Sequence, residues 1–158
     1  MSRQRLERLN TLLGMKEKAM EKAGEMLKQA REQFTAGKSK HDQIVSYRQD
    51  YVEQLHRMGD TGCTLGRLRN RIDFINQLDT ILIQLNQQLS QLAKFRTQCE
   101  KKFLQAKAEK DAVIRLIERV KLQRSEQLAR LEQKESDEYA QKQWYSKNST
   151  NNPDKRGG

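Results

Sequence analysis

Three of the chain's eight glycines lie in one short segment, MGDTGCTLG at 58–66, and arginines follow at positions 67, 69 and 71. Glycines beside basic residues could form a phosphate-binding loop, in which backbone N–H groups hold the phosphate oxygens. Such a nucleotide-binding loop needs the pattern GxxxxGK[ST] between a strand and a helix, and this segment has no lysine. The GxxG pattern of RNA-binding loops matches residues 59–62, but Asp60 would repel a phosphate backbone. We therefore interpret the segment as a turn that ends one helix, with Thr64 capping the next.

Other residue types that could do chemistry are sparse. The two histidines, His41 and His56, are fifteen residues apart and match no metal-ligand spacing. Acidic residues alternate with lysines and glutamines, as on a solvated helix face. The two cysteines, Cys63 and Cys99, would be separated by roughly 50 Å along a helix, so they cannot pair within one chain. We expect no enzyme, with no catalytic, cofactor-binding or metal-binding residues.

Apolar residues recur every seven positions, and this periodicity indicates that long helices carry the residues described above. Only 35% of the 158 residues are apolar and 33% are charged, which is too polar to fill a globular core. Apolar residues nevertheless recur at the a and d positions of a coiled coil in both halves of the chain. The first half has Leu6, Leu13, Met20, Leu27 and Phe34; the second has Leu78, Leu85, Leu92, Cys99, Ala106, Val113 and Val120. His41 and Arg48 are poor core residues at seam positions of the first half, and Arg96 and Lys110 interrupt the apolar seam of the second.

We predict an all-α fold: a long antiparallel two-helix coiled-coil hairpin with a disordered C-terminal tail. The expected segments are a first helix at 3–57, a hairpin turn at 58–66, a longer second helix at 67–145 and a disordered tail at 146–158. Folding the chain near residue 62 sets the two seams face to face, with about 25 residues of the second helix, from near Arg119 to Trp144, extending past the N-terminus. Gly14, Gly24 and Gly37 should each weaken the first helix by roughly 1 kcal/mol relative to alanine.

The net charge of +10 leaves a basic rod that binds nucleic acid as an alternative. Basic and acidic residues are interleaved along the whole chain, which favours an ordinary solvated surface. Small basic clusters at positions 3, 5 and 8 and at 67, 69 and 71 could also meet acidic protein partners. No signal peptide and no apolar run of membrane-spanning length is present, so we expect no transmembrane segment.

A group of apolar residues near the turn exceeds what the seam needs. Tyr47 and Phe74 lie off the seam, and in the hairpin Phe74 comes opposite Tyr51. One explanation is that the seam widens here to compensate for polar residues at positions 41 and 48. The other is a protein-binding surface, because aromatic residues gathered on a rod are typical anchors of such contacts. We call this group the aromatic patch; it consists of Ile44, Tyr47, Tyr51, Phe74, Leu78 and Ile81.

The segments YRQDYVEQLHRMGDTG and RLRNRIDFINQLDTIL resemble the FliJ family of flagellar type III export proteins. The shared features are a Tyr-x-x-x-Tyr pair, a glycine-containing turn and a later aromatic-Ile-x-x-Leu segment. The segment 137–141, Asp-Glu-Tyr-Ala-Gln, resembles the acidic-aromatic closing motif of the family. The resemblance covers about residues 6 to 142.

The resemblance implies a cytoplasmic stalk, peripheral at the inner face of the cell membrane, in the export machinery that builds the flagellum for motility and chemotaxis. Its implied partners are the hexameric export ATPase, the cytoplasmic domain of the membrane export gate, and export chaperones, with no nucleic acid. The aromatic patch would contact the gate. The end that carries both termini would enter the ATPase ring, and its candidate contacts, called here the arginine set, are Arg5, Arg8, Arg119 and Arg124. A stalk of a virulence-type injection system is the alternative.

Overall fold

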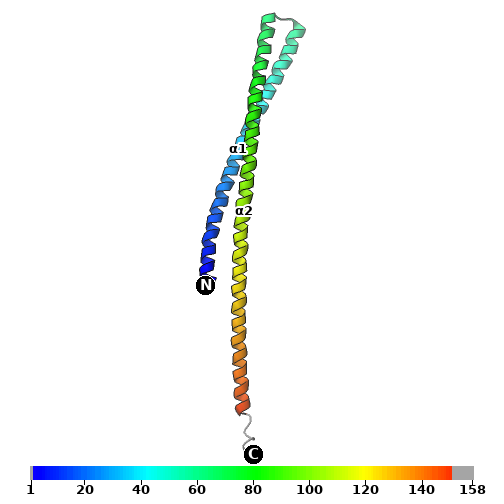
Figure 1. The fold of residues 1–158 in the computed structure, drawn as a ribbon. Helices are drawn as coiled ribbons and strands as arrows, with labels where there is room; N and C mark the ends of the chain where they lie inside the picture. Colours follow the sequence, from blue (N-terminus) through cyan, green and yellow to red (C-terminus); the bar gives the residue numbers. More distant parts are fainter. Residues whose placement is uncertain (1, 151–158) are drawn as a thin grey trace, which may run out of the picture. The chain divides into compact units, whose positions relative to one another are not determined.

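The protein consists of two helices joined by a short connection (Figure 1). The structure, a computed structural model, describes residues 2–150, in which α1 spans Ser2–Thr61 and α2 spans Leu65–Thr150. The expected all-α two-helix hairpin is confirmed, because residues of α1 pair with residues of α2 in reverse order. Neither described helix contains a stretch apolar enough and long enough to cross a membrane.

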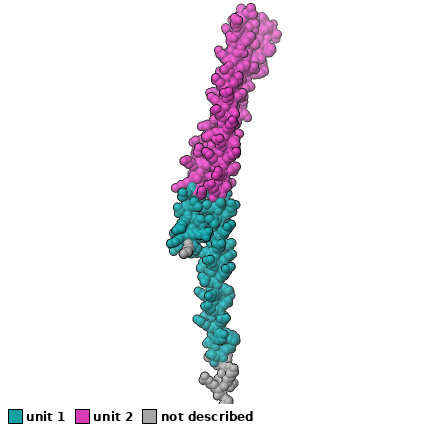
Figure 2. Space-filling view, in the orientation of Figure 1, with its two compact units in different colours: residues 1–15, 110–158 teal, residues 16–109 magenta. Residues whose placement is uncertain are grey.

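The chain divides into two compact units, shown in different colours in Figure 2. One unit comprises residues 16–109 and contains the connection between the helices. The other comprises residues 1–15 with 110–158 and contains both termini. We refer to them as the connection unit and the terminal unit and describe each by itself.

In the connection unit, the seam predicted from the heptads forms the core. Leu27, Ala30 and Cys99 are buried together, and Phe103 packs against them. Cys99 is only 3% exposed, so it acts as a small apolar core residue, as expected from its seam position. Farther toward the connection, Leu78 and other apolar seam residues of α2 are also buried.

Two glycines that weaken α1 locally also let the helices approach each other. A Cβ atom on Gly24 would lie 3.3 Å from Phe103 Cε2, and one on Gly37 would lie 3.1 Å from Leu92 Cδ1. Both distances are tighter than ordinary van der Waals contact, so the missing side chains leave room for these core residues. Gly14 has no atom within 4 Å of such a Cβ and shows no comparable packing role.

The connection unit also has an ion pair between its two helices. Lys16 Nζ donates a hydrogen bond of 3.0 Å to Glu109 Oε2. This hydrogen bond, together with the lysine charge, lowers the pKa of the Glu109 carboxyl. Because the folded-state pKa is lowered, any stabilisation from the pair is present at neutral pH and is lost as the pH falls through that value.

In the terminal unit, the start of α1 packs on α2 through a second apolar cluster. Leu9, Val113, Ile117 and Val120 are buried, and Leu6, Leu12, Leu13 and Leu116 pack around them. Leu6 therefore packs against the cluster that contains Val120, and the two seams face each other in this unit as expected. From residue 121 to 149 every residue of α2 is exposed, so this part of the helix contributes nothing to the buried cluster.

The connection is shorter than the predicted turn at 58–66. Helix α1 continues to Thr61, whose hydroxyl donates a 2.9 Å hydrogen bond to the Arg57 carbonyl, and only residues 62–64 are non-helical. Gly62 ends the helix with a φ of 78°, a left-handed conformation in which side chains are strained. Thr64 caps α2 as expected: its Oγ1 accepts from the Arg67 N–H at 3.4 Å.

The C-terminal boundary also differs from the prediction. Helix α2 continues through Thr150, whereas the sequence analysis placed a disordered tail from residue 146. Serine and asparagine are only modestly poorer helix formers than alanine, and no proline occurs before Pro153, so nothing forces the helix to end earlier. The rest of the predicted tail, 151–158, lies outside the described residues.

The connection predicts opposite effects for two glycine substitutions. Gly62→Ala should destabilise the hairpin by about 1 kcal/mol because alanine is strained at a positive φ. Gly59→Ala should stabilise it by about 0.5–1 kcal/mol, since Gly59 is helical and a Cβ there meets no atom within 4 Å. Urea unfolding followed by circular dichroism measures both changes, and the same sign for both would contradict the assigned role of Gly62.

Candidate functional site: the aromatic patch and the arginine set

The aromatic patch is built around a stacked pair that joins the two helices. The rings of Tyr51 in α1 and Phe74 in α2 have centroids 4.6 Å apart, with planes inclined by 46°. This contact confirms that Tyr51 and Phe74 lie opposite each other. The Arg71 guanidinium lies 4.9 Å from the Tyr51 ring centroid and also donates a hydrogen bond to Gln54. Aromatic pairs and cation–π contacts of this kind each contribute about 0.5–1.5 kcal/mol.

The members of the aromatic patch differ in their exposure. Tyr47 is 55% exposed and Phe74 is 39% exposed, although aromatic side chains of this size are usually buried in protein cores. Ile81 is exposed as well, and Ile44 and Tyr51 are half-buried. Leu78 is only 5% exposed and belongs to the core, so it is not part of the surface that a partner could touch.

The patch is accompanied by a surface groove that sequence reasoning did not identify. The groove combines aromatic and apolar side chains with polar ones from α2, and its lining consists of Tyr51, Met58, Arg67, Asn70, Arg71 and Phe74. Arg67 and Arg71 had been noted only as a basic cluster. Their spacing of four residues, one helical turn, is the signal that would have placed them on the face of Phe74.

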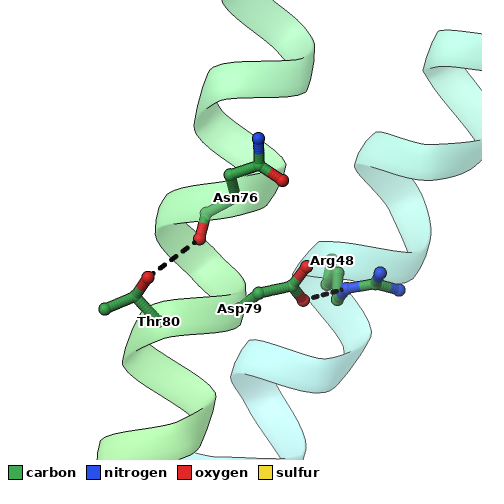
Figure 3. Close-up of polar contacts among 4 residues, drawn as sticks. All are labelled: Arg48, Asn76, Asp79 and Thr80. Atoms are coloured by element: carbon green, nitrogen blue, oxygen red, sulfur yellow. Dashed lines mark hydrogen bonds and ion pairs between the residues drawn. The ribbon is translucent and has the colours of Figure 1, made fainter.

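One interruption of the apolar seam is resolved by an ion pair (Figure 3). Arg48 Nε of α1 donates a 2.5 Å hydrogen bond to Asp79 Oδ1 of α2, and both side chains are partly buried. On the same helix as Asp79, the Thr80 hydroxyl donates to the Asn76 carbonyl at 3.2 Å. The seam therefore tolerates Arg48 because a carboxylate lies opposite it. Folding the sequence about the turn would have placed Asp79 near Arg48 and so identified this partner.

The other arginine on the seam is accommodated by an aromatic ring. The Arg96 guanidinium lies 4.2 Å from the centroid of Phe34, while its Nε atom is buried without a hydrogen-bond partner. The flat guanidinium stacks on the ring and leaves its polar edge less well satisfied. This contact was not foreseen from the sequence, in which Arg96 was treated only as an interruption.

In the terminal unit, three members of the arginine set share one groove. Arg5 and Arg8 of α1 and Arg124 of α2 line it, whereas Arg119 does not. The remaining lining residues are mostly uncharged and polar: Ser2, Gln4, Val120, Gln123 and Gln127. Gln123 and Gln127 were missed because glutamine is frequent throughout the second half and carries no distinctive pattern.

Beyond this groove, the exposed part of α2 displays large apolar side chains. Its exposed members are Leu122, Leu128, Leu131, Tyr139, Trp144 and Tyr145. The rings of Trp144 and Tyr145 contact each other edge to face, with centroids 5.1 Å apart. Large apolar side chains gathered on an exposed helix are typical of a surface that binds another protein.

Comparison with known protein families assigns the chain to one of them. A family model described as the flagellar FliJ protein matches residues 4–149. The chain belongs to the FliJ family. No curated protein and no solved structure matches it. The match extends over both helices, including the exposed part of α2, so the family assignment does not depend on the turn alone.

Membership of the FliJ family identifies the chain as a component of flagellar protein export. Of the contexts considered from the sequence, the match supports the flagellar one over an injection system or a nucleic-acid-binding rod. Within residues 2–150, no group of three or more His, Cys, Asp or Glu side chains could hold a metal ion. The chemistry of these surfaces is that of protein contacts: aromatic rings, arginines and exposed leucines.

The Arg48–Asp79 pair should be measurable by a double-mutant cycle. We expect a coupling of about 0.5–1 kcal/mol between Arg48→Met and Asp79→Asn, because the pair is only partly buried. Urea unfolding of the two single variants and the double variant gives this value. The matched control is Arg3 with Glu7, an exposed pair within α1 that should couple more weakly. Equal coupling in both pairs would contradict a role for Arg48 in joining the helices.

Proposed function

We propose that this FliJ-family chain is a cytoplasmic stalk that links the flagellar export ATPase to the membrane export gate. In this proposal the terminal unit enters the central opening of the hexameric ATPase and promotes its assembly and activity. The aromatic patch contacts the cytoplasmic domain of the gate. The observation that carries the proposal is the family match over residues 4–149, which includes both of these surfaces.

The terminal unit has features suited to insertion into a ring. Residues 121–149 form a single helix with every residue exposed, and single helices are marginally stable alone unless a partner covers their apolar side chains. The groove next to it presents Arg5, Arg8 and Arg124. Arginines at such a site could pair with carboxylates that line a ring, and would hold the helix by charge as well as by apolar contact.

The aromatic patch has features suited to a separate contact. Tyr47 and Phe74 are exposed, while the stacking of Phe74 on Tyr51 holds its ring in one orientation. A rigid aromatic side chain loses little conformational entropy on binding, which makes it an effective anchor. These properties support gate binding at the patch. Export chaperones are proposed as further partners on the basis of the family match. The proposed location at the inner face of the membrane rests on the family match.

The ATPase contact predicts a selective loss of stimulation. The unchanged protein should raise the hydrolysis rate of the purified export ATPase. Replacing Arg5, Arg8 and Arg124 together by glutamine should lower that stimulation by at least about tenfold, since each of the three charged contacts contributes on the order of 0.5–1 kcal/mol. The steady-state rate of phosphate release measures it. An equal loss with Tyr47→Ala/Phe74→Ala, which changes only the patch, would contradict the assignment of the ATPase contact to the terminal unit.

For the gate contact, we expect the loss in the variant of the aromatic patch. Tyr47→Ala/Phe74→Ala should weaken binding to the cytoplasmic domain of the gate by at least tenfold, because exposed aromatic anchors typically contribute more than about 1 kcal/mol each. Isothermal titration calorimetry measures the affinity, and circular dichroism checks that helicity is kept. The control is Ile83→Ala/Phe95→Ala, two exposed apolar residues of the same unit outside the patch. Failure of the unchanged protein to bind either partner would overturn the proposed function.

A further inference from the structure

The hairpin apex, residues 57–71, combines concentrated positive charge with a projecting apolar side chain. It contains four arginines and one acidic residue, Asp60, for a net charge of +3. The other 143 residues together carry only +7. At its N-terminal end α2 presents Leu65, which is 84% exposed, more than any other large apolar side chain in the described part of the chain. Neither the core nor the aromatic patch uses Leu65.

We infer that the hairpin apex binds directly to a surface of anionic phospholipid headgroups, with Leu65 entering the interface and the arginines contacting phosphates. Arg57, Arg67 and Arg69 are exposed and have no ion-pair partner given by the structure of residues 2–150. Arg71 is different, because it stacks on Tyr51 and bonds to Gln54. Three arginines are therefore available to a surface placed against the connection.

The spacing of charges along the helices favours such a surface. At about 1.5 Å per residue, Arg57, Arg67 and Arg69 lie within roughly 6 Å of the helix ends at the connection. The nearest acidic residues on the helices beyond the apex, Glu53 and Asp73, lie about 12 Å from those ends, which exceeds the Debye length of about 8 Å at physiological salt. A charged plane at the connection would thus meet mainly positive charge.

A lipid surface fits this apex better than an acidic protein segment. The most exposed apolar residue lies at the start of α2 beside the connection and is not part of the groove at Arg67 and Phe74. A flat, mobile array of headgroups needs no complementary pocket and can accept one inserted leucine together with several arginines. An acidic peptide would instead be expected to use the groove at Arg67 and Phe74. The inference goes beyond the proposed function and holds or fails without the ATPase or the gate.

Vesicle sedimentation of the purified full chain tests the inference. It should bind phosphatidylcholine vesicles that contain phosphatidylglycerol, bind vesicles of phosphatidylcholine alone far less, and release as salt rises. Arg67→Gln/Arg69→Gln should lower the partition coefficient roughly 25-fold, because each basic residue near an anionic surface contributes about fivefold. Leu65→Gln should lower it about tenfold through lost apolar insertion.

The control variant Arg115→Gln/Arg130→Gln removes the same charge from exposed positions of α2 outside the apex and should bind like the unchanged protein. Circular dichroism shows whether each variant keeps its helicity. No binding to anionic vesicles at low salt overturns the inference, and so does an equal loss in the control variant. If Arg67→Gln/Arg69→Gln leaves vesicle binding intact, the lipid inference is wrong. Weaker binding of the same variant to the gate's cytoplasmic domain would then show that the apex serves an acidic protein instead.

Discussion

A pair of helices can bury only the stripe along which they touch, and this limit governs the whole molecule. Each helix contributes one row of apolar residues, while every other face remains in water. Stability therefore depends on a thin core in each unit, Leu27 with Cys99 in one and Leu9 with Val120 in the other. Such a core leaves little reserve, so a partner that binds the folded hairpin would add substantially to its stability.

The same limit explains which parts of the fold could be predicted from the sequence. Helix content, the antiparallel pairing and the Tyr51–Phe74 contact followed from heptad spacing folded about residue 62, because the pairing of a hairpin is set by its turn. The helix ends were less accurate. Thr61 and residues 146–150 are polar and lack a clear stop signal, and in such segments small propensity differences do not fix a boundary.

The site was predictable to a different extent. Aromatic residues in excess of the seam marked the patch, but the sequence could not separate Leu78, which is buried, from Phe74, which is exposed. On a narrow seam, a small rotation of the helix about its axis decides which of two residues one turn apart is buried and which is exposed. The spacing of Arg67 and Arg71 places them on the face of Phe74, but whether a groove forms there depends on how the side chains of the two helices meet.

The two arginines within the seam have a consequence for how the helices align. Arg48 requires Asp79 opposite it, and Arg96 requires the face of Phe34. Leucines repeating every seven residues would pack almost equally well if one helix slid by a heptad, about 10 Å along the axis. Such a slip would separate both arginines from these partners, so Arg48 would lose its ion pair and Arg96 its ring contact. Polar residues in the seam thus disfavour a slipped pairing and add to the axial register that the turn sets.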